Sequence, residues 1–465
     1  MPAVALILSG EQHGYLEPCG CSETQSGGMA RRADLIDQLK QRGWSIASLD
    51  LGGTLKRNRR QSRIKFETLL NTLRDMHYTA MALGPEELAL GAEYLLSQHI
   101  IDAEDPADNL AFVAANVVLF DAPDLGTPLR SKTLEINNVK VGVTAVFGPS
   151  LQDRFISNDI RVDPPENVLP AVIDELKQQA PDLLVLLSHG SLEESRGLAE
   201  AYPEFDLILT AGGPEDPDEE PELVGKTMLL QVGHKGKYVG VVGFYPDATE
   251  NRLRFELVDL DHRRFKSSAV MHEHMRQYQE RLLGENLVSD EFPIDHPSGW
   301  TFVGVGKCGE CHINAYNKWR DPGEMPYHHA HAYESLKQGR KGQEKNWISR
   351  VNDPECVVCH VTGWDQQTFF RYESGFLSPE KTPHLVAQQC ENCHGPGSEH
   401  VRLEELFKTD RTQVTTGELA ELRKAMHLSI ETAEKHVCSK CHDLDNSPHF
   451  EFKEYWEKIK HPWRD

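Results

Sequence analysis

Short apolar runs alternate with helical stretches between residue 3 and about residue 260 of the chain. Each run has the length and β-branched content of a strand, and glycine or polar residues stand at its end. The predicted strands are residues 3–9, 45–51, 79–84, 111–120, 140–147, 182–189, 206–213 and 228–245. Apolar residues recur at helical spacing in residues 29–41 and 62–76. Strands that alternate with helices predict an α/β fold built in layers, here a sandwich.

The pattern changes beyond this region. Residues 264–283 predict one amphipathic helix, and Gly, Pro and Asp without periodicity follow it. Eight of the ten Cys, 13 of the 22 His and six of the seven Trp lie at or after Trp300. We therefore predict a front domain over residues 1–262, a helix and linker over 263–300, and a mainly helical or irregular domain over 301–465.

Composition limits the kinds of partner. The chain is 39% hydrophobic and 26% charged, which is ordinary for a soluble globular protein. Its net charge of −23 is uneven, because residues 301–465 hold 21 basic and 25 acidic residues, which leaves 28 against 47 before them. An acidic front half argues against nucleic acid or an anionic membrane as partner. No apolar run is long enough to span a bilayer.

Four segments read Cys-x-x-Cys-His, at residues 308–312, 356–360, 390–394 and 438–442. This is the attachment sequence of c-type haem, in which two thiols bind the porphyrin and the adjacent His binds iron. Zinc or disulfides are the alternative, but four matches that use every Cys of this domain favour haem. We predict four covalently bound haem c, with other metals not expected. The predicted attachment residues are Cys308, Cys311, Cys356, Cys359, Cys390, Cys393, Cys438 and Cys441, and the proximal ligands are His312, His360, His394 and His442.

Nine more His in this domain could supply the opposite, distal ligands of four haems. This surplus permits two His on every iron, an arrangement without an open position that suits electron transfer. The distal candidates that we select are His329, His331, His400, His427, His461 and His449.

The back domain resembles the tetrahaem cytochrome c-554 family in "KCGECHINAYNKW", "HHAHAYESLK", "ECVVCHVTGW" and "CENCHGPGSEH". The resemblance covers residues 303–400. It implies that His400 serves the first haem, His329 the third, and a C-terminal His the fourth, for which we prefer His461 to His449. The second haem of that family is five-coordinate. This chain offers additional His nearby, so we expect six-coordination there, with His331 or His427 as ligand.

The front domain resembles the UshA-like metallophosphatases (5'-nucleotidase family) in its order of strands and in "GGMARRADLIDQL" and "QVGHKGKYVG". The chemistry of that family needs two cations bridged by a carboxylate, with His, Asn and Asp ligands. The resemblance keeps His13 and His189 in their motifs. Gly53 replaces the bridging Asp, and Pro85 replaces the Asn.

Further ligand positions of the family are also changed. Glu11 replaces an Asp, Glu86 replaces the catalytic His, and Gly213 and Glu215 replace two more His. We therefore expect an inactive phosphatase domain. The alternative is a relic site for one divalent cation, formed by Glu11, His13, Glu86, His189 and Glu215.

Cys19 and Cys21 are the two remaining thiols, and they stand two residues apart. A disulfide at that spacing is strained and easily reduced. The pair is either a redox-active or soft-metal site, or it is passive.

Haem is attached outside the cytoplasm, yet the chain opens on a domain strand and not on an export signal. We expect a periplasmic or extracellular protein whose signal precedes this numbering. The leading hypothesis is an electron carrier for redox partner proteins, including other cytochromes, with the front domain used for docking or assembly. The alternatives are a redox enzyme acting on a small nitrogen or sulfur compound at an open haem, and a homo-oligomer or filament of stacked protomers.

Overall fold

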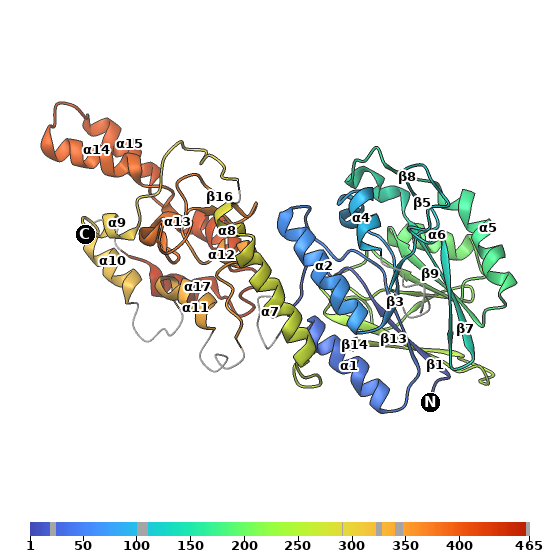
Figure 1. Cartoon of the computed structure of the whole chain (residues 1–465). Coiled ribbons are helices and arrows are strands. Elements are labelled where there is room, and N and C mark those ends of the chain that lie inside the picture. Colours follow the sequence, from blue (N-terminus) through green and yellow to red (C-terminus); the bar gives the residue numbers. More distant parts are fainter. Residues whose placement is uncertain (19–24, 100–109, 291, 322–327, 340–346, 462–465) are drawn as a thin grey trace. The chain divides into compact units, whose positions relative to one another are not determined.

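The computed structural model of the chain is drawn in Figure 1. It describes residues 1–18, 25–99, 110–290, 292–321, 328–339 and 347–461, so the thiol pair Cys19 and Cys21 lies outside the described residues. Two compact units are present, Met1–Tyr278 and Gln279–Asp465. The division falls within residues 263–300, the segment that the sequence assigns to helix and linker.

The first unit is built on two six-stranded sheets. The first sheet has the order β14-β13-β1-β2-β3-β4 and the second has the order β11-β12-β10-β9-β7-β6. Strands β1 to β4 pair in parallel, as do β7, β9, β10 and β12, and the remaining pairs in the two sheets are antiparallel. The first sheet comprises β1 (Val4–Ser9), β2 (Ile46–Asp50), β3 (Tyr78–Met81), β4 (Ala111–Phe112), β13 (Tyr238–Phe244) and β14 (Leu253–Asp259), and the second comprises β6 (Ser131–Ile136), β7 (Val139–Phe147), β9 (Leu183–His189), β10 (Leu207–Thr210), β11 (Glu222–Val224) and β12 (Thr227–Leu230).

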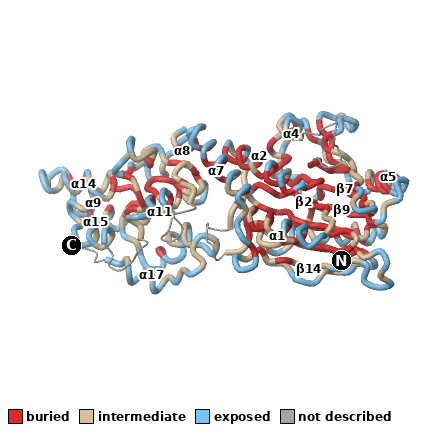
Figure 2. The backbone as a smooth tube through the Cα atoms, turned by 60° about the horizontal axis from the view of Figure 1, so that its bottom comes forward, coloured by how far each residue is buried: buried red, intermediate tan, exposed pale blue. Residues whose placement is uncertain are grey.

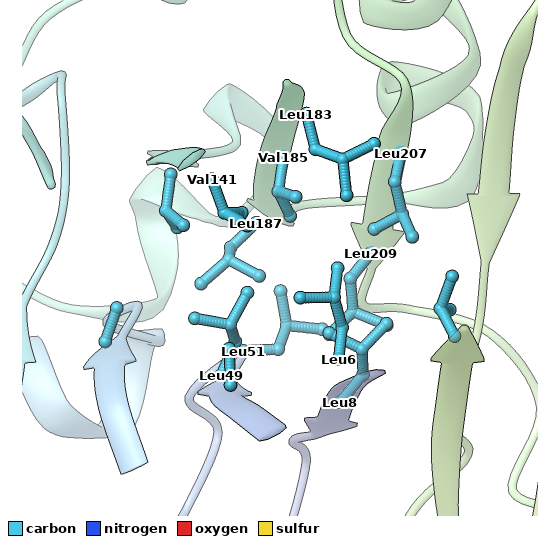
Figure 3. Close-up of a cluster of buried hydrophobic side chains, with 14 of the residues drawn as sticks. Leu6, Leu8, Leu49, Leu51, Val141, Leu183, Val185, Leu187, Leu207 and Leu209 are labelled. Atoms are coloured by element: carbon cyan, nitrogen blue, oxygen red, sulfur yellow. The ribbon is translucent and has the colours of Figure 1, made fainter. Parts of the chain in front are cut away.

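Apolar side chains from both sheets share one core. Leu6 and Leu49 of the first sheet lie in the same buried cluster as Val141, Leu187 and Leu207 of the second, as Figure 3 shows. The parallel strands are buried on both faces, which is why they read as continuous apolar runs in the sequence.

Helices cover the outer faces of this sandwich. Leu169, Val172 and Leu176 of α5 (Pro165–Gln178) pack with Leu186 of β9, and α6 (Leu192–Ala201) lies beside them. Helix α2 contacts β3 of the other sheet. The predicted helices are confirmed as α1 (Met29–Gln41) and α2 (Arg60–Asp75). The layered α/β fold class is thus confirmed (Figure 1). The other elements of this unit are α3 (Pro85–Leu88), α4 (Ala92–Gln98), β5 (Val117–Leu119), η2 (Pro149–Arg154) and β8 (Ile160–Val162).

The second unit is mainly helical and irregular, as predicted. Helix α7 (Ala269–Gly284) begins in the first unit and ends in the second. Residues that the sequence assigns to a linker take part in the second unit, since Val288 belongs to its buried cluster and Ile294 bridges to Tyr372. Its elements are α8 (Leu287–Asp290), α9 (Val305–Gly309), α10 (Ile313–Arg320), η3 (His329–His331), α11 (Ala332–Gln338), α12 (Pro354–Val357), β15 (Trp364–Asp365), β16 (Phe370–Arg371), η5 (Pro383–Leu385), α13 (Cys390–His394), α14 (Ser398–Thr409), α15 (Thr416–Ala425), α16 (Ile430–Thr432), η6 (Ala433–Val437), η7 (Cys438–Lys440) and α17 (Phe452–Ile459).

Buried residues are distributed differently in the two units. In Figure 2 they fill the strands of the first unit, whereas the second unit consists mostly of intermediate and exposed residues. Its apolar cluster gathers around Trp364, Phe376 and Val357. Folded units with little buried apolar surface are commonly stabilised by bound groups.

Candidate functional site

Each Cys-x-x-Cys-His segment lies in or beside a short helical turn. The third segment is the whole of α13, the first spans the end of α9, and the second begins in α12. The backbone N–H of His312 donates to Cys308 at 2.9 Å, and that of His442 donates to Cys438 at 2.8 Å. Such a turn brings the two thiols and the imidazole of a segment close together.

Thiols of different segments also meet. The Cys390 thiol lies close enough to that of Cys308 to raise the pKa of Cys308, and the Cys359 thiol raises that of Cys441 in the same way. None of the described cysteines is in a disulfide. The first segment is therefore next to the third, and the second is next to the fourth.

Three segment histidines face a second histidine. Ring centres are 6.3 Å apart for His312 and His400, 6.0 Å for His442 and His329, and 5.8 Å for His394 and His461. A metal between two imidazoles needs two bonds of about 2 Å, and each ring centre lies about 1 Å further, which gives about 6 Å. All three pairs fit one iron between the rings.

The surroundings of His400 and His329 also favour binding of a metal. Within the described residues, Nδ1 of His400 is buried and has no hydrogen-bond partner. Burial lowers the pKa of His329 to about 4, with His442 as a further cause. The His329 imidazole is therefore neutral at physiological pH, which is the form that binds metal.

The pairing differs in part from what the resemblance implies. His400 lies opposite His312 of the first segment, where it is expected. His329 faces the fourth segment and not the third, whereas His461 faces the third and not the fourth. The other C-terminal candidate, His449, is exposed. His329 also lies near the second segment, because the charge of His360 contributes to the lowering of its pKa.

The second segment is held differently. His360 donates from Nδ1 to the Ala332 carbonyl at 2.7 Å. Of its two expected ligands, His331 packs on His328 with ring centres 4.1 Å apart, and His427 lies near His394 of the third segment and contributes to lowering the pKa of His394. Six-coordination at this segment therefore stays a prediction.

In the first unit, several relic ligands meet at the ends of the strands. Glu11 and His13 follow β1, and His189 ends β9. His234 joins them, with its ring centre 4.9 Å from that of His13 and its Nε2 3.4 Å from the Glu11 carboxylate. The sequence pointed to His234 only as part of "QVGHKGKYVG", without a role.

Positively charged side chains pair with the carboxylates of Glu86 and Glu215. Arg154, at the end of η2, pairs with Glu86 at 2.5 Å. Lys235 and Lys237 pair with Glu215 at 2.7 and 2.5 Å. Sequence reasoning missed Arg154, because nothing local marks a residue whose contact is far along the chain.

Little space remains for a side chain at Gly53, the position of the bridging Asp in the resembled family. A Cβ added at Gly53 would lie 3.1 Å from the His189 ring, and the φ of +68° disfavours a side chain there. Over the described ranges, no group of three or more His, Cys, Asp or Glu could hold a metal ion. The relic single-cation site of Glu11, His13, Glu86, His189 and Glu215 stays a prediction.

Burial dominates the electrostatics of this cleft. It raises the pKa of Glu11 to about 7, and the nearby Glu86 adds to the rise. It lowers the pKa of His13 to about 3, with further lowering from His234 and His189. Near neutral pH the cleft thus holds a partly protonated Glu11 carboxyl and a neutral His13 imidazole.

Residues 307–395 match the family model described as "Cytochrome c554 and c-prime". The second unit resembles cytochrome c554. The chain is 29% identical to cytochrome c-554 of Nitrosomonas europaea over 173 residues, which cover 35% of this chain and 63% of that protein. The match of this cytochrome c554-like unit implies covalently bound haem c.

The first unit matches phosphoesterases. It is 25% identical to the metallophosphoesterase YunD of Bacillus subtilis over 268 residues, covering 54% of this chain and 55% of that protein. The structure of the sulfate thiohydrolase SoxB of Thermus thermophilus aligns with a TM-score of 0.51 at 17% identity, covering 66% of this chain and 62% of that one. This structural likeness shows a shared fold. The chain spans less than two thirds of the length of the curated relatives described here.

Among helices of the described segments, none has the length and apolar composition needed to cross a bilayer.

Proposed function

We propose that this protein is an exported tetrahaem c-type cytochrome that transfers electrons in the periplasm or outside the cell. Bound haem would supply reversible one-electron chemistry. The observation that carries the proposal is the set of three imidazole pairs, at centre-to-centre distances of 5.8 to 6.3 Å. Two histidines on an iron leave no position for a substrate, so transfer of electrons is favoured over small-molecule chemistry.

The proximity of the segments supports the same function. A thiol of the third segment raises the pKa of one in the first, and a thiol of the second segment does the same to one in the fourth. Groups attached at these thiols would lie close together in pairs. We infer a route along which an electron moves between neighbouring haems within one unit.

The first unit serves in this proposal as a non-catalytic docking or assembly domain. Its cleft is closed at Gly53, and Arg154 and two lysines neutralise its carboxylates. The chain before residue 301 carries 28 basic and 47 acidic residues. A redox partner with a basic surface, such as another cytochrome, would be steered toward it.

Spectroscopy of the holoprotein tests this function. Electron paramagnetic resonance of the ferric protein should show low-spin signals from at least three haems, and reduction should be reversible without added substrate. Cyanide, which needs an open iron, should bind at one haem or none. High-spin signals from most of the haems, with matching cyanide binding, would replace the carrier with an enzyme.

A further inference from the structure

The proximal histidines differ in the acceptor of their Nδ1–H. His360 and His394 are bonded at 2.7 Å to backbone carbonyls, of Ala332 and Met426 respectively, and the Ser335 hydroxyl lies further from Nδ1 of His360, at 3.4 Å. His442 instead lies 3.0 Å from the side-chain hydroxyl of Ser447. A carbonyl is a fixed acceptor, whereas a hydroxyl is a weaker acceptor that can rotate.

A short loop builds this contact. The backbone N–H of Ser447 donates to the Asp443 carbonyl at 2.9 Å, and the Asp443 carboxylate accepts from the Asn446 N–H at 2.7 Å. These two bonds form a turn directly after His442. The turn places the hydroxyl beside the ring.

The same loop covers one face of the imidazole. The N–H of Phe450 donates to the Ser447 carbonyl at 2.9 Å. The Phe450 ring then lies parallel to that of His442, with centres 4.5 Å apart and an angle of 12°. Tyr455 of α17 packs against Phe450 with centres 4.9 Å apart, which fixes Phe450 in turn. The ring of His442 can therefore rotate little.

We propose that Ser447 is a positioning residue that tunes the reduction potential of the fourth haem through Nδ1 of His442. The inference rests on the proposed function. An acceptor on the outer nitrogen of a metal-bound imidazole fixes its orientation and raises its basicity. A more basic ligand favours ferric over ferrous iron, so the acceptor lowers the potential of that haem.

Three substitutions at one position separate this role from a structural one. Ser447→Ala removes the acceptor, Ser447→Asp supplies a stronger one, and Ser447→Thr keeps the hydroxyl. The matched control is Ser439→Ala, because Ser439 lies within the same segment but bonds the Lys435 carbonyl at 3.1 Å. Each variant is titrated potentiometrically as the full-length holoprotein, with the haem load measured by mass.

We expect Ser447→Ala to raise one of the four potentials and Ser447→Asp to lower the same one. A tenfold change in the ferric-to-ferrous ratio at fixed potential, about 59 mV for one electron, is the scale expected. Ser447→Thr and Ser439→Ala should leave all four potentials in place. Should the alanine variant lose its haem, a lowered potential in Ser447→Asp beside an unchanged one in Ser447→Thr still tests the proposal.

The proposal is wrong if the Ala or Asp variant retains the haem load and the low-spin signals of the unsubstituted protein and every potential is unchanged. Failure of the proposed function looks different, because it appears already in the unsubstituted protein as missing haem or open iron.

Discussion

The imidazoles of His312 and His400 face each other 6.3 Å apart, and their planes differ by 22°. His312 closes the first Cys-x-x-Cys-His segment, whereas His400 comes from α14, almost 90 residues further along the chain. Two rings brought together from such distant positions, with a buried free Nδ1 on one of them, indicate a shared ligand that is not part of the polypeptide.

Removing His400 should therefore open one iron. We expect His400→Ala to convert one haem equivalent from low-spin to high-spin ferric, and to add one equivalent of cyanide binding relative to the unsubstituted protein. Paramagnetic resonance measures the conversion. His449→Ala is the control, because His449 is exposed and should change neither signal. An unchanged spectrum in His400→Ala would exclude this pair as axial ligands.

The pairing of His329 with the fourth segment can be tested by combining variants. His329→Ala alone should create one high-spin haem, because its ring faces His442. In a protein that lacks the fourth haem through Cys438→Ser and Cys441→Ser, the same change should add no high-spin signal. His461→Ala should still add one there, because His461 faces His394. High-spin iron from His329→Ala in the three-haem protein would assign His329 to another haem.

The sequence predicts those helices, strands and motifs that depend on residues close together in the chain. Helix α1 has the predicted bounds, since an apolar face at helical spacing and the preceding glycines mark it. The strands β6 and β14 were missed, because each has alternating polar residues and lies at a sheet edge. The four segments are likewise local signals, and the spacing of their residues identifies them.

The pairing of each distal histidine with a segment is not determined by neighbouring residues in the sequence. It depends on contacts between segments, such as that of Cys359 with Cys441, and no spacing in the chain encodes these. Arg154 and Ser447 were missed for related reasons. Arg154 acts on a residue 68 positions away, and Ser447 is one of many serines until the turn at Asp443 places it beside His442.

The first unit should lack metal-dependent phosphatase activity. We expect no hydrolysis of phosphomonoesters or nucleotides with added manganese, zinc or cobalt, and no change in His189→Ala. Gly53→Asp should not restore activity, because its Cβ would meet the His189 ring at 3.1 Å. Steady-state phosphate release is the measurement. Turnover that needs metal and disappears in His189→Ala would show that a working centre survives.

Stability of the first unit should depend on pH through Glu11. Burial raises its pKa in the folded protein to about 7, from an ordinary value of 4.5. Between these values the unfolded chain loses the proton while the folded chain keeps it. Stability should therefore fall as pH rises from about 4.5 to 7, by up to about 3 kcal/mol, and should not fall further above that range through this group.

Glu11→Gln removes this titration. Urea denaturation followed by far-UV circular dichroism at pH 5 and pH 8 should show a gain for the variant at pH 8 and little change at pH 5. Glu175→Gln on α5 is the matched control, because Glu175 is exposed. Equal stability of Glu11→Gln and the unsubstituted protein at pH 8 would argue against a buried, penalised carboxylate.

The mass of the intact, matured protein tests the central claim most directly. Four complete Cys-x-x-Cys-His segments predict a covalent addition of four haem groups per chain, stable to denaturation and to removal of free metal. Ser replacements at Cys390 and Cys393 should lower the addition by one group. A fully matured sample that carries three haems or fewer, or zinc in their place, would contradict the tetrahaem account.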